Sequence, residues 1–236
     1  MTLEGYGNPQ PIHEAARNAD VDALRQLLGE GVSPNLADDY GSMPLQFLCT
    51  KDEGDADNRV ACFNMLVDAG ADAHAETAKM TPLALAARCG PPELVAALLN
   101  SGANVNWRDS TGWMPLHWAC WRYPPSAKCV ELLLNAGAPV NAKTDLGRTT
   151  PLGIAIAKGN QQRTYPSLLR AGAILPGPAP RDDVCFRKVR AAGGIKKYER
   201  AHLNAIAATF APKFSHLLPP ELVRRVVEYA FHVGDY

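Results

Sequence analysis

Enzyme chemistry or metal binding would need histidine, cysteine and carboxylate side chains at defined spacings, and this chain does not supply them. The stretch HEAAR (13–17) begins like the HExxH motif of zinc proteases, but Arg17 stands where the second histidine must lie. The six cysteines are scattered, without a CxxC pair. No phosphate-binding glycine loop, serine elbow or dinucleotide fingerprint is present. We therefore expect no enzyme activity, no metal and no cofactor.

Carboxylates gather in TKDEGDADNR (50–59), where they could bind a cation. A calcium loop requires the pattern D-x-D-x-D-G with a glutamate further on, and this stretch does not have it. We interpret residues 50–59 as a solvated acidic loop.

Aromatic side chains are the remaining group with a marked spacing. Three of the four tryptophans lie in GWMPLHWACW (112–121), and Trp107 lies just upstream. Such side chains could fill a core, flank a pocket or face a partner. Trp118 and Trp121 are three residues apart, so a helix would place them on one face. The choice depends on the elements that hold them.

One apolar pattern recurs along the chain and predicts a series of similar helices. Its five copies are LLGEG (27–31), LVDAG (66–70), LLNSG (98–102), LLNAG (133–137) and LLRAG (168–172). Each copy ends in glycine, the residue that closes a helix in the left-handed conformation. The closing glycines are 39, 32, 35 and 35 residues apart, so the repeating unit is about this long.

A second helix, opening with proline, is predicted before each of these copies. The five openings are PIHEAA (11–16), MPLQFLC (43–49), TPLALAA (81–87), MPLHWAC (114–120) and TPLGIAI (150–156). Proline in the first helical turn costs no hydrogen bond and fixes φ for helix entry. The alanines allow neighbouring units to approach closely. One unit alone could not bury its leucine stripe, whereas stacked units can, so the pattern predicts an all-α solenoid.

These stretches resemble the ankyrin repeat, whose pattern is roughly G-x-TPLHxAA followed by V-x-x-LLxxGAxVN. The resemblance covers about residues 10–176, in five units, and implies helix-turn-helix units with projecting β-hairpin loops. It gives an ankyrin-repeat domain over residues 1–176 and a C-terminal helical segment over residues 177–236.

The resemblance also assigns a structural role to two histidines. His117 and His13 occupy the TPLH histidine of the family, which helps to order the turn. The other units have Gln46, Ala84 and Gly153 at this position, so we expect their turns to be less well fixed.

In the ankyrin family, the hairpin tips and the outer face of the inner helix line a concave groove that binds partners. The residues of this chain that the resemblance assigns to partner binding are Trp113, Trp121, Arg122, Trp118, Arg108 and Tyr123. Trp, Tyr and Arg are the types most enriched at interface hot spots. The resemblance thus implies a non-catalytic protein–protein interaction module.

Two alternatives for the tryptophans stay open. Trp118 could pack between adjacent inner helices, and Trp113 could cover the next hairpin. The same aromatic side chains could also make the protein a structural scaffold that self-associates.

The C-terminal stretch LPPELVRRVVEY (218–229) resembles the opening of an F-box, which docks onto the adaptor subunit of cullin-type ubiquitin ligases. On that resemblance the docking residues are Leu218, Pro219, Leu222 and Val226, and the protein is a substrate-recognition subunit. The alternative is that this segment caps the exposed apolar end of the solenoid.

Composition narrows the class of partner and the location. The chain has 24 basic and 24 acidic residues, which favours neither nucleic acid nor a polycation as partner. No signal peptide and no apolar run long enough to cross a bilayer is visible. We therefore expect an intracellular protein, cytoplasmic, nuclear or both, with protein partners and no membrane contact.

Overall fold

The computed structural model describes residues 9–51, 55–75, 80–158 and 164–174, and a few positions between 188 and 201. By its internal contacts the chain divides into two compact units, residues 1–173 and 174–236. The F-box-like residues Leu218, Pro219, Leu222 and Val226 lie outside the described residues.

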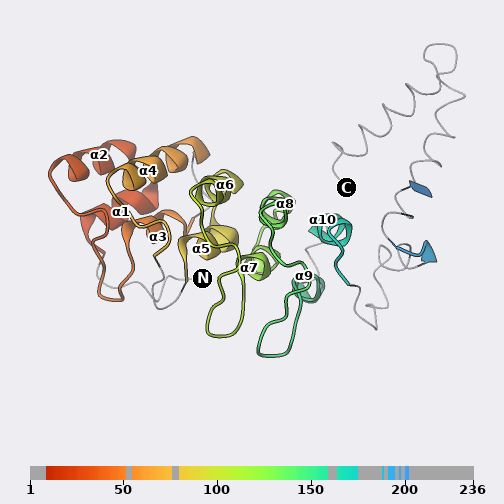
Figure 1. The fold of residues 1–236 in the computed structure, drawn as a ribbon. Helices are drawn as coiled ribbons and strands as arrows, with labels where there is room; N and C mark the ends of the chain where they lie inside the picture. Colours follow the sequence, from red (N-terminus) through yellow and green to blue (C-terminus); the bar gives the residue numbers. More distant parts are fainter. Residues whose placement is uncertain are drawn as a thin grey trace, which may run out of the picture. The chain divides into compact units, whose positions relative to one another are not determined.

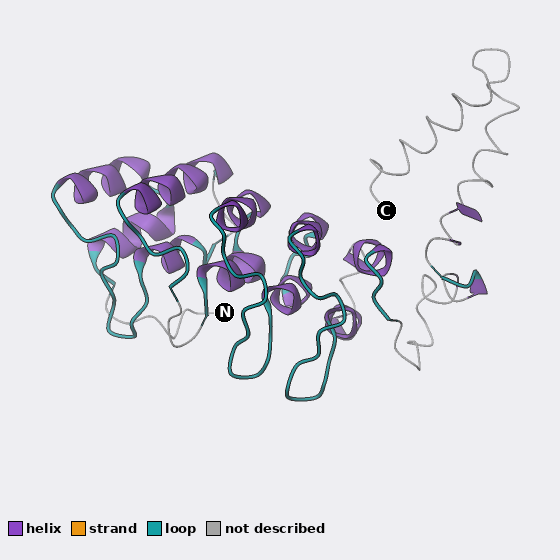
Figure 2. Cartoon of the chain, viewed as in Figure 1, coloured by secondary structure: helices purple, strands orange, loops and turns teal. Residues whose placement is uncertain are grey.

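In the described part of the first unit, ten helices form two rows (Figure 1). The inner row is α1 (Pro11–Asn18), α3 (Pro44–Leu48), α5 (Pro82–Cys89), α7 (Pro115–Trp121) and α9 (Pro151–Lys158). The outer row is α2 (Val21–Gly29), α4 (Ala56–Asp68), α6 (Pro92–Asn100), α8 (Ala127–Asn135) and α10 (Tyr165–Arg170). Long loops project from the two rows on the side of the inner helices (Figure 2). No strand occurs among these residues, and the predicted all-α solenoid is confirmed.

The predicted start and stop signals act where they were expected. Each inner helix begins with its proline. The five closing glycines, at positions 31, 70, 102, 137 and 172, all have φ between 85° and 93°. This left-handed conformation lets the chain turn from each outer helix into the projecting loop.

Small side chains on the inner row and leucines on the outer row make the core. On the inner row the fully buried alanines are Ala16, Ala84, Ala86, Ala87, Ala119 and Ala155. On the outer row the fully buried leucines are Leu24, Leu66, Leu94, Leu98, Leu133 and Leu168. Because alanine adds little bulk, α1 packs against α3, and α7 packs between α5 and α9. Each outer helix thereby packs against the inner helix of its own pair and against a neighbouring outer helix.

The acidic stretch at 50–59 is only partly a loop, which corrects the prediction. Helix α4 begins at Ala56, and the Asp55 carboxylate caps it by accepting from Asp57 N at 3.0 Å. Arg59 is not solvated but 1% exposed, and its Nη1 donates to Leu48 O at 2.8 Å. A helix N-terminus favours carboxylates electrostatically, so Asp55 and Asp57 suit the start of α4.

Buried cysteines of this unit are kept as thiols by their surroundings. Burial raises the pKa of Cys62 to about 11, and it raises the pKa of Cys49 and Cys120 far above the usual range. Since the thiolate is the reactive form, these three cysteines act as small apolar core residues.

Candidate functional site

Three tryptophans and two cations form a continuous stack across the inner row, which we call the tryptophan surface: Arg88, Trp118, Trp113, Trp121 and Lys158. The ring centroids of Trp113 and Trp118 lie 4.5 Å apart, and those of Trp113 and Trp121 lie 5.6 Å apart. These separations are typical of aromatic pairs that attract beyond their buried area. The central ring is therefore Trp113, with one tryptophan of α7 on either side.

A cation covers each end of this stack. The Arg88 guanidinium carbon lies 5.2 Å from the Trp118 ring centroid, and the Lys158 ammonium lies 3.1 Å from that of Trp121. Arg88 comes from the last turn of α5 and Lys158 ends α9. Cation–π contacts of this kind contribute about 0.5–2 kcal/mol each. The surface thus joins three successive helix pairs.

Trp118 is held at a cost. Its indole N–H is fully buried and finds no acceptor among the described residues. An unmade hydrogen bond of a buried donor costs about 1–3 kcal/mol. The stack with Trp113 and Arg88 offsets this cost. The Trp118 ring packs between these two side chains, as one alternative expected, and it remains partly exposed.

The structure corrects the placement of Arg122. This residue was assigned to the partner surface, but it is only 3% exposed. Its Nη1 donates to Gly90 O at 2.9 Å and contacts Cys129 Sγ at 3.1 Å, and its Nε donates to Pro124 O at 3.2 Å. The guanidinium therefore ties the turn after α5 to the segment after α7, and it offers nothing to a partner.

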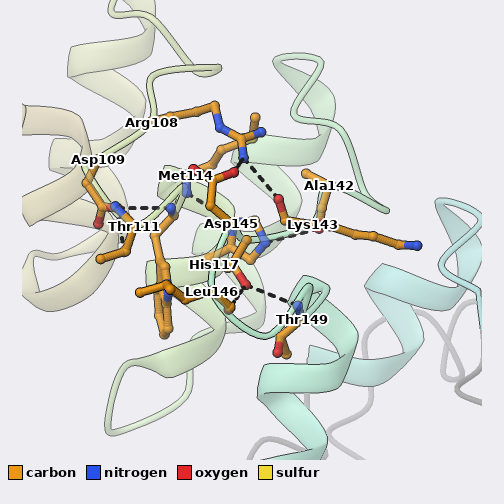
Figure 3. Close-up of polar contacts among 12 residues, drawn as sticks. Arg108, Asp109, Thr111, Met114, His117, Ala142, Lys143, Asp145, Leu146 and Thr149 are labelled. Carbon is orange, nitrogen blue, oxygen red and sulfur yellow. Dashed lines mark hydrogen bonds and ion pairs between the residues drawn. The ribbon is translucent and has the colours of Figure 1, made fainter.

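The other predicted site residues lie at the surface in different ways. Trp121 is 42% exposed and Tyr123 is 80% exposed. Arg108 is exposed but already bound to the next loop, since its Nη2 donates to Asp145 Oδ1 at 2.8 Å and to Lys143 O at 3.0 Å (Figure 3). Trp121 and Tyr123 are thus available to a partner, whereas Arg108 braces two loops.

The loop before α7 is built around one carboxylate (Figure 3). Asp109 Oδ1 accepts from Thr111 N at 2.8 Å and from Trp113 N at 3.0 Å. Asp109 N in turn donates to Trp113 O at 2.9 Å, which closes the hairpin. Asp109 therefore fixes the backbone that carries Trp113 into the stack.

His117 joins its own helix start to the following loop, as the resemblance implied. Its Nδ1 accepts from Met114 N at 3.0 Å, and its Nε2 lies 3.1 Å from Ala142 O (Figure 3). With Nδ1 accepting, the neutral ring carries its proton on Nε2 and donates to that carbonyl. His13 makes the same two contacts in the first helix pair, with Gln10 N and Leu36 O.

The expectation that turns without this histidine are less well fixed is wrong for the second helix pair. Gln46 Oε1 accepts from Met43 N at 2.8 Å, and its Nε2 donates to Met80 O at 2.9 Å. The amide therefore reproduces both bonds of the imidazole. At Ala84 and Gly153, a threonine hydroxyl accepts from the helix N–H instead, Thr81 at 3.3 Å and Thr150 at 3.2 Å.

Because Gln46 replaces the imidazole in the second helix pair, it predicts how the variant His117→Gln will behave. Burial lowers the pKa of His117, and a proton added on Nδ1 would face the Met114 N–H. A histidine pKa lowered in the folded state costs stability as pH falls below about 6.5, the value in the unfolded chain. We expect His117→Gln to keep its stability at pH 7 within about 1 kcal/mol and to lose less of it between pH 7 and pH 5.

Urea unfolding at pH 7, 6 and 5 measures this difference. Since all other groups titrate in both proteins, the gap between the two curves reports His117 alone, up to about 1.4 kcal/mol per pH unit. His117→Ala is the control, because it leaves Met114 N without its acceptor and destabilises at every pH. Parallel curves for wild type and His117→Gln would contradict the prediction.

Sequence reasoning missed Arg88 and Lys158, which complete the tryptophan surface. Both lie in the last turn of an inner helix, so their place near the helix end was the available signal. It also missed two exposed apolar side chains of the projecting loops, Tyr40 at 54% and Leu146 at 73% exposure. Their position at hairpin tips could have indicated them.

In the described ranges, no group of three histidine, cysteine or carboxylate side chains is placed to hold a metal ion. The helices of those ranges are too short or too polar to cross a membrane.

Comparison with known proteins matches this architecture. The family model "Ankyrin repeats (3 copies)" matches three overlapping windows, residues 12–109, 56–144 and 93–173. Human ankyrin repeat and SOCS box protein 16 is 35% identical over 161 residues, 65% of this chain and 34% of that protein. Inversin from Canis lupus familiaris is 33% identical over 155 residues, and human neurogenic locus notch homolog protein 2 is 35% identical over 127 residues. These stretches are 64% and 54% of this chain but 14% and 5% of those two proteins, so the chain spans only part of each relative's length.

Proposed function

The chain belongs to the ankyrin repeat family, and from this premise we propose that it is a non-catalytic, intracellular module that binds a protein partner through the tryptophan surface. The proposal includes five repeats within residues 1–176 and a separate C-terminal segment over residues 177–236. The five helix pairs and the two compact units support this division.

The observation that carries the proposal is the exposure of Trp121 within an ordered aromatic stack. Exposure of a large apolar ring to water is unfavourable. Here the exposed Trp121 ring is held in a fixed orientation by Trp113, whose ring centroid lies 5.6 Å away, and by the Lys158 ammonium, which lies 3.1 Å from its centroid. Ordering a side chain before binding removes much of the entropy cost of an interface. Buried tryptophan anchors are worth about 2 kcal/mol or more in protein interfaces.

The proposal predicts that Trp121→Ala weakens partner binding by at least about tenfold, the equivalent of 1.4 kcal/mol. The measurement is quantitative affinity capture from cell extract with the full chain as bait, wild type against variant, followed by a Kd for the leading partner. Tyr40→Ala is the matched control, since Tyr40 is an exposed aromatic on the first projecting loop. Equal losses for the two variants, or none for Trp121→Ala, would refute the proposal.

Self-association is the competing explanation of the same surface. Light scattering of the wild type and of Trp113→Ala separates the two. A wild-type mass that is larger than that of the variant would indicate a scaffold whose tryptophan surface binds a second copy.

A second function is favoured by the sequence LPPELVRRVVEY (218–229): substrate recognition for a cullin-type ubiquitin ligase. One relative carries, by its name, ankyrin repeats and a SOCS box in a single chain, so repeats joined to another named module have a parallel. In this scheme the repeats bind the substrate and the C-terminal segment binds the ligase adaptor.

Binding of purified adaptor to the full chain tests this second function. We expect binding to the wild type and its loss in a Leu218→Ala/Leu222→Ala variant, while capture through the tryptophan surface stays unchanged. Absence of adaptor binding to the wild type would leave the C-terminal segment as a cap of the repeats.

A further inference from the structure

The charges around the tryptophan surface are mostly basic, although the whole chain balances 24 basic with 24 acidic residues. Helices α5, α7 and α9 contain two charged side chains, Arg88 and Lys158, and no carboxylate. The only other ionisable group on these helices apart from the cysteines is His117, whose pKa is lowered by burial, so that it is neutral at pH 7. The helical part of the surface is therefore cationic.

The carboxylates of the loops before α7 and α9 are already used within the protein. Asp109 accepts from the backbone and hydroxyl of Thr111 and from Trp113 N, at 2.6 to 3.0 Å. Asp145 accepts from Arg108 at 2.8 Å. In the described part of the chain, neither Arg88 nor Lys158 makes an ion pair. Each charge lies over a tryptophan face, and Arg88 Nη1 also lies 3.9 Å from Met80 Sδ, a weak acceptor. Both cations can therefore still pair with an outside anion.

The stack sets the distance between the two cations. Its successive centroid steps of 5.2, 4.5, 5.6 and 3.1 Å place them at most about 18 Å apart. An extended peptide advances about 3.3 Å per residue, so a segment of about six residues reaches from one cation to the other. Between them lie only aromatic faces.

From this arrangement we infer that the tryptophan surface binds a short acidic and apolar peptide segment of a partner protein, with a carboxylate at each end and bulky apolar side chains between. One carboxylate pairs with the Arg88 guanidinium, whose fork suits two parallel hydrogen bonds, and the other pairs with Lys158. The apolar side chains cover Trp121 and Trp113. The inference rests on the proposed function and specifies its partner.

Selection from a displayed library of random dodecapeptides on the full chain tests this inference. The wild type is expected to enrich peptides in which aspartate or glutamate flanks apolar residues. Exchange of either acid for its amide should weaken the Kd about fivefold, the upper range for a partly exposed ion pair. Added salt should also weaken binding, because it screens such pairs.

A charge-reversed variant, Arg88→Glu/Lys158→Glu, supplies a result that a structural role would not give. It is expected to select lysine- and arginine-flanked peptides instead of acidic ones. Arg25→Glu is the matched control, since Arg25 lies exposed on α2 and pairs with Asp22, and it should select the wild-type peptides. Thermal melts of each protein confirm that it is folded.

Three results would overturn the inference. If the selected peptides show no charge preference, the acidic partner is rejected. If Trp121→Ala still abolishes their binding, the proposed function stands, with an apolar peptide as the partner. Failure of the wild type to select any peptide would reject the short segment, and the capture experiment with Trp121→Ala would then judge the proposed function separately. Binding of a DNA duplex that depends on Arg88 and Lys158 but not on Trp121 would make the surface a polyanion site.

Discussion

Replacing Gly112 by alanine is expected to destabilise the repeats by about 3–4 kcal/mol. Gly112 has a φ of 79°, a conformation that costs other residues about 1–2 kcal/mol. An added Cβ would also lie 2.5 Å from Asp145 Cγ and 2.7 Å from Asp145 N. That backbone N donates to Thr111 O at 3.0 Å, so relief of the clash must break the bond between two neighbouring loops.

Gly41→Ala is the matched control for this prediction. Gly41 occupies the corresponding turn of an earlier loop with a φ of 77°, and an added Cβ there meets nothing within 4 Å. It should therefore cost only the conformational part, about 1–2 kcal/mol. Urea unfolding of the full chain measures both. If the two variants unfold alike, the loops separate at no cost and the contact between Gly112 and Asp145 has no energetic role.

Arg122→Ala is expected to lower the stability of the repeats by about 3 kcal/mol, and with it the melting temperature by roughly 6–12 °C. The substitution leaves Gly90 O and Pro124 O without their charged donor and opens a cavity beside Cys129. Differential scanning calorimetry measures the shift. The effect contrasts with the sequence-based expectation, which assigned Arg122 to partner binding.

Two further variants sharpen this prediction. Arg122→Met restores volume without hydrogen bonds, so the part of the loss that it does not recover reports the bonds. Arg25→Ala removes an exposed arginine paired with Asp22 at 2.7 Å, and such surface pairs are worth about 0–1 kcal/mol. Should Arg122→Ala cost no more than Arg25→Ala, the buried guanidinium would be replaceable by water.

The architecture could be predicted from the sequence because its signals are local and repeated. The proline at each inner helix start and the glycine after each outer helix act through backbone conformation within one turn. Each unit repeats the same proline and glycine signals, so an irregular unit can be recognised by comparison with its neighbours. For this reason even the short α3 (Pro44–Leu48) was found in its place.

The site could be predicted only in part because its contacts join residues of different units. Trp118 and Trp121 share one stretch of sequence, but their cations come from α5 and α9, more than twenty residues away on either side. Arg122 directly follows the exposed Trp121 in the sequence, yet its side chain points the other way and is buried against Gly90 O. Periodicity gives the face of a helix, whereas the partners across units depend on loop geometry.

The histidine and glutamine bonds that join successive units end on backbone carbonyls of the next unit. His13 reaches Leu36 O, Gln46 reaches Met80 O, and His117 reaches Ala142 O. A carbonyl is the same for every residue type, so these three bonds form whatever the sequence of the next unit. An exchanged unit would keep these junction bonds. It would not keep the tryptophan surface, because Arg88, the tryptophans and Lys158 come from three successive units.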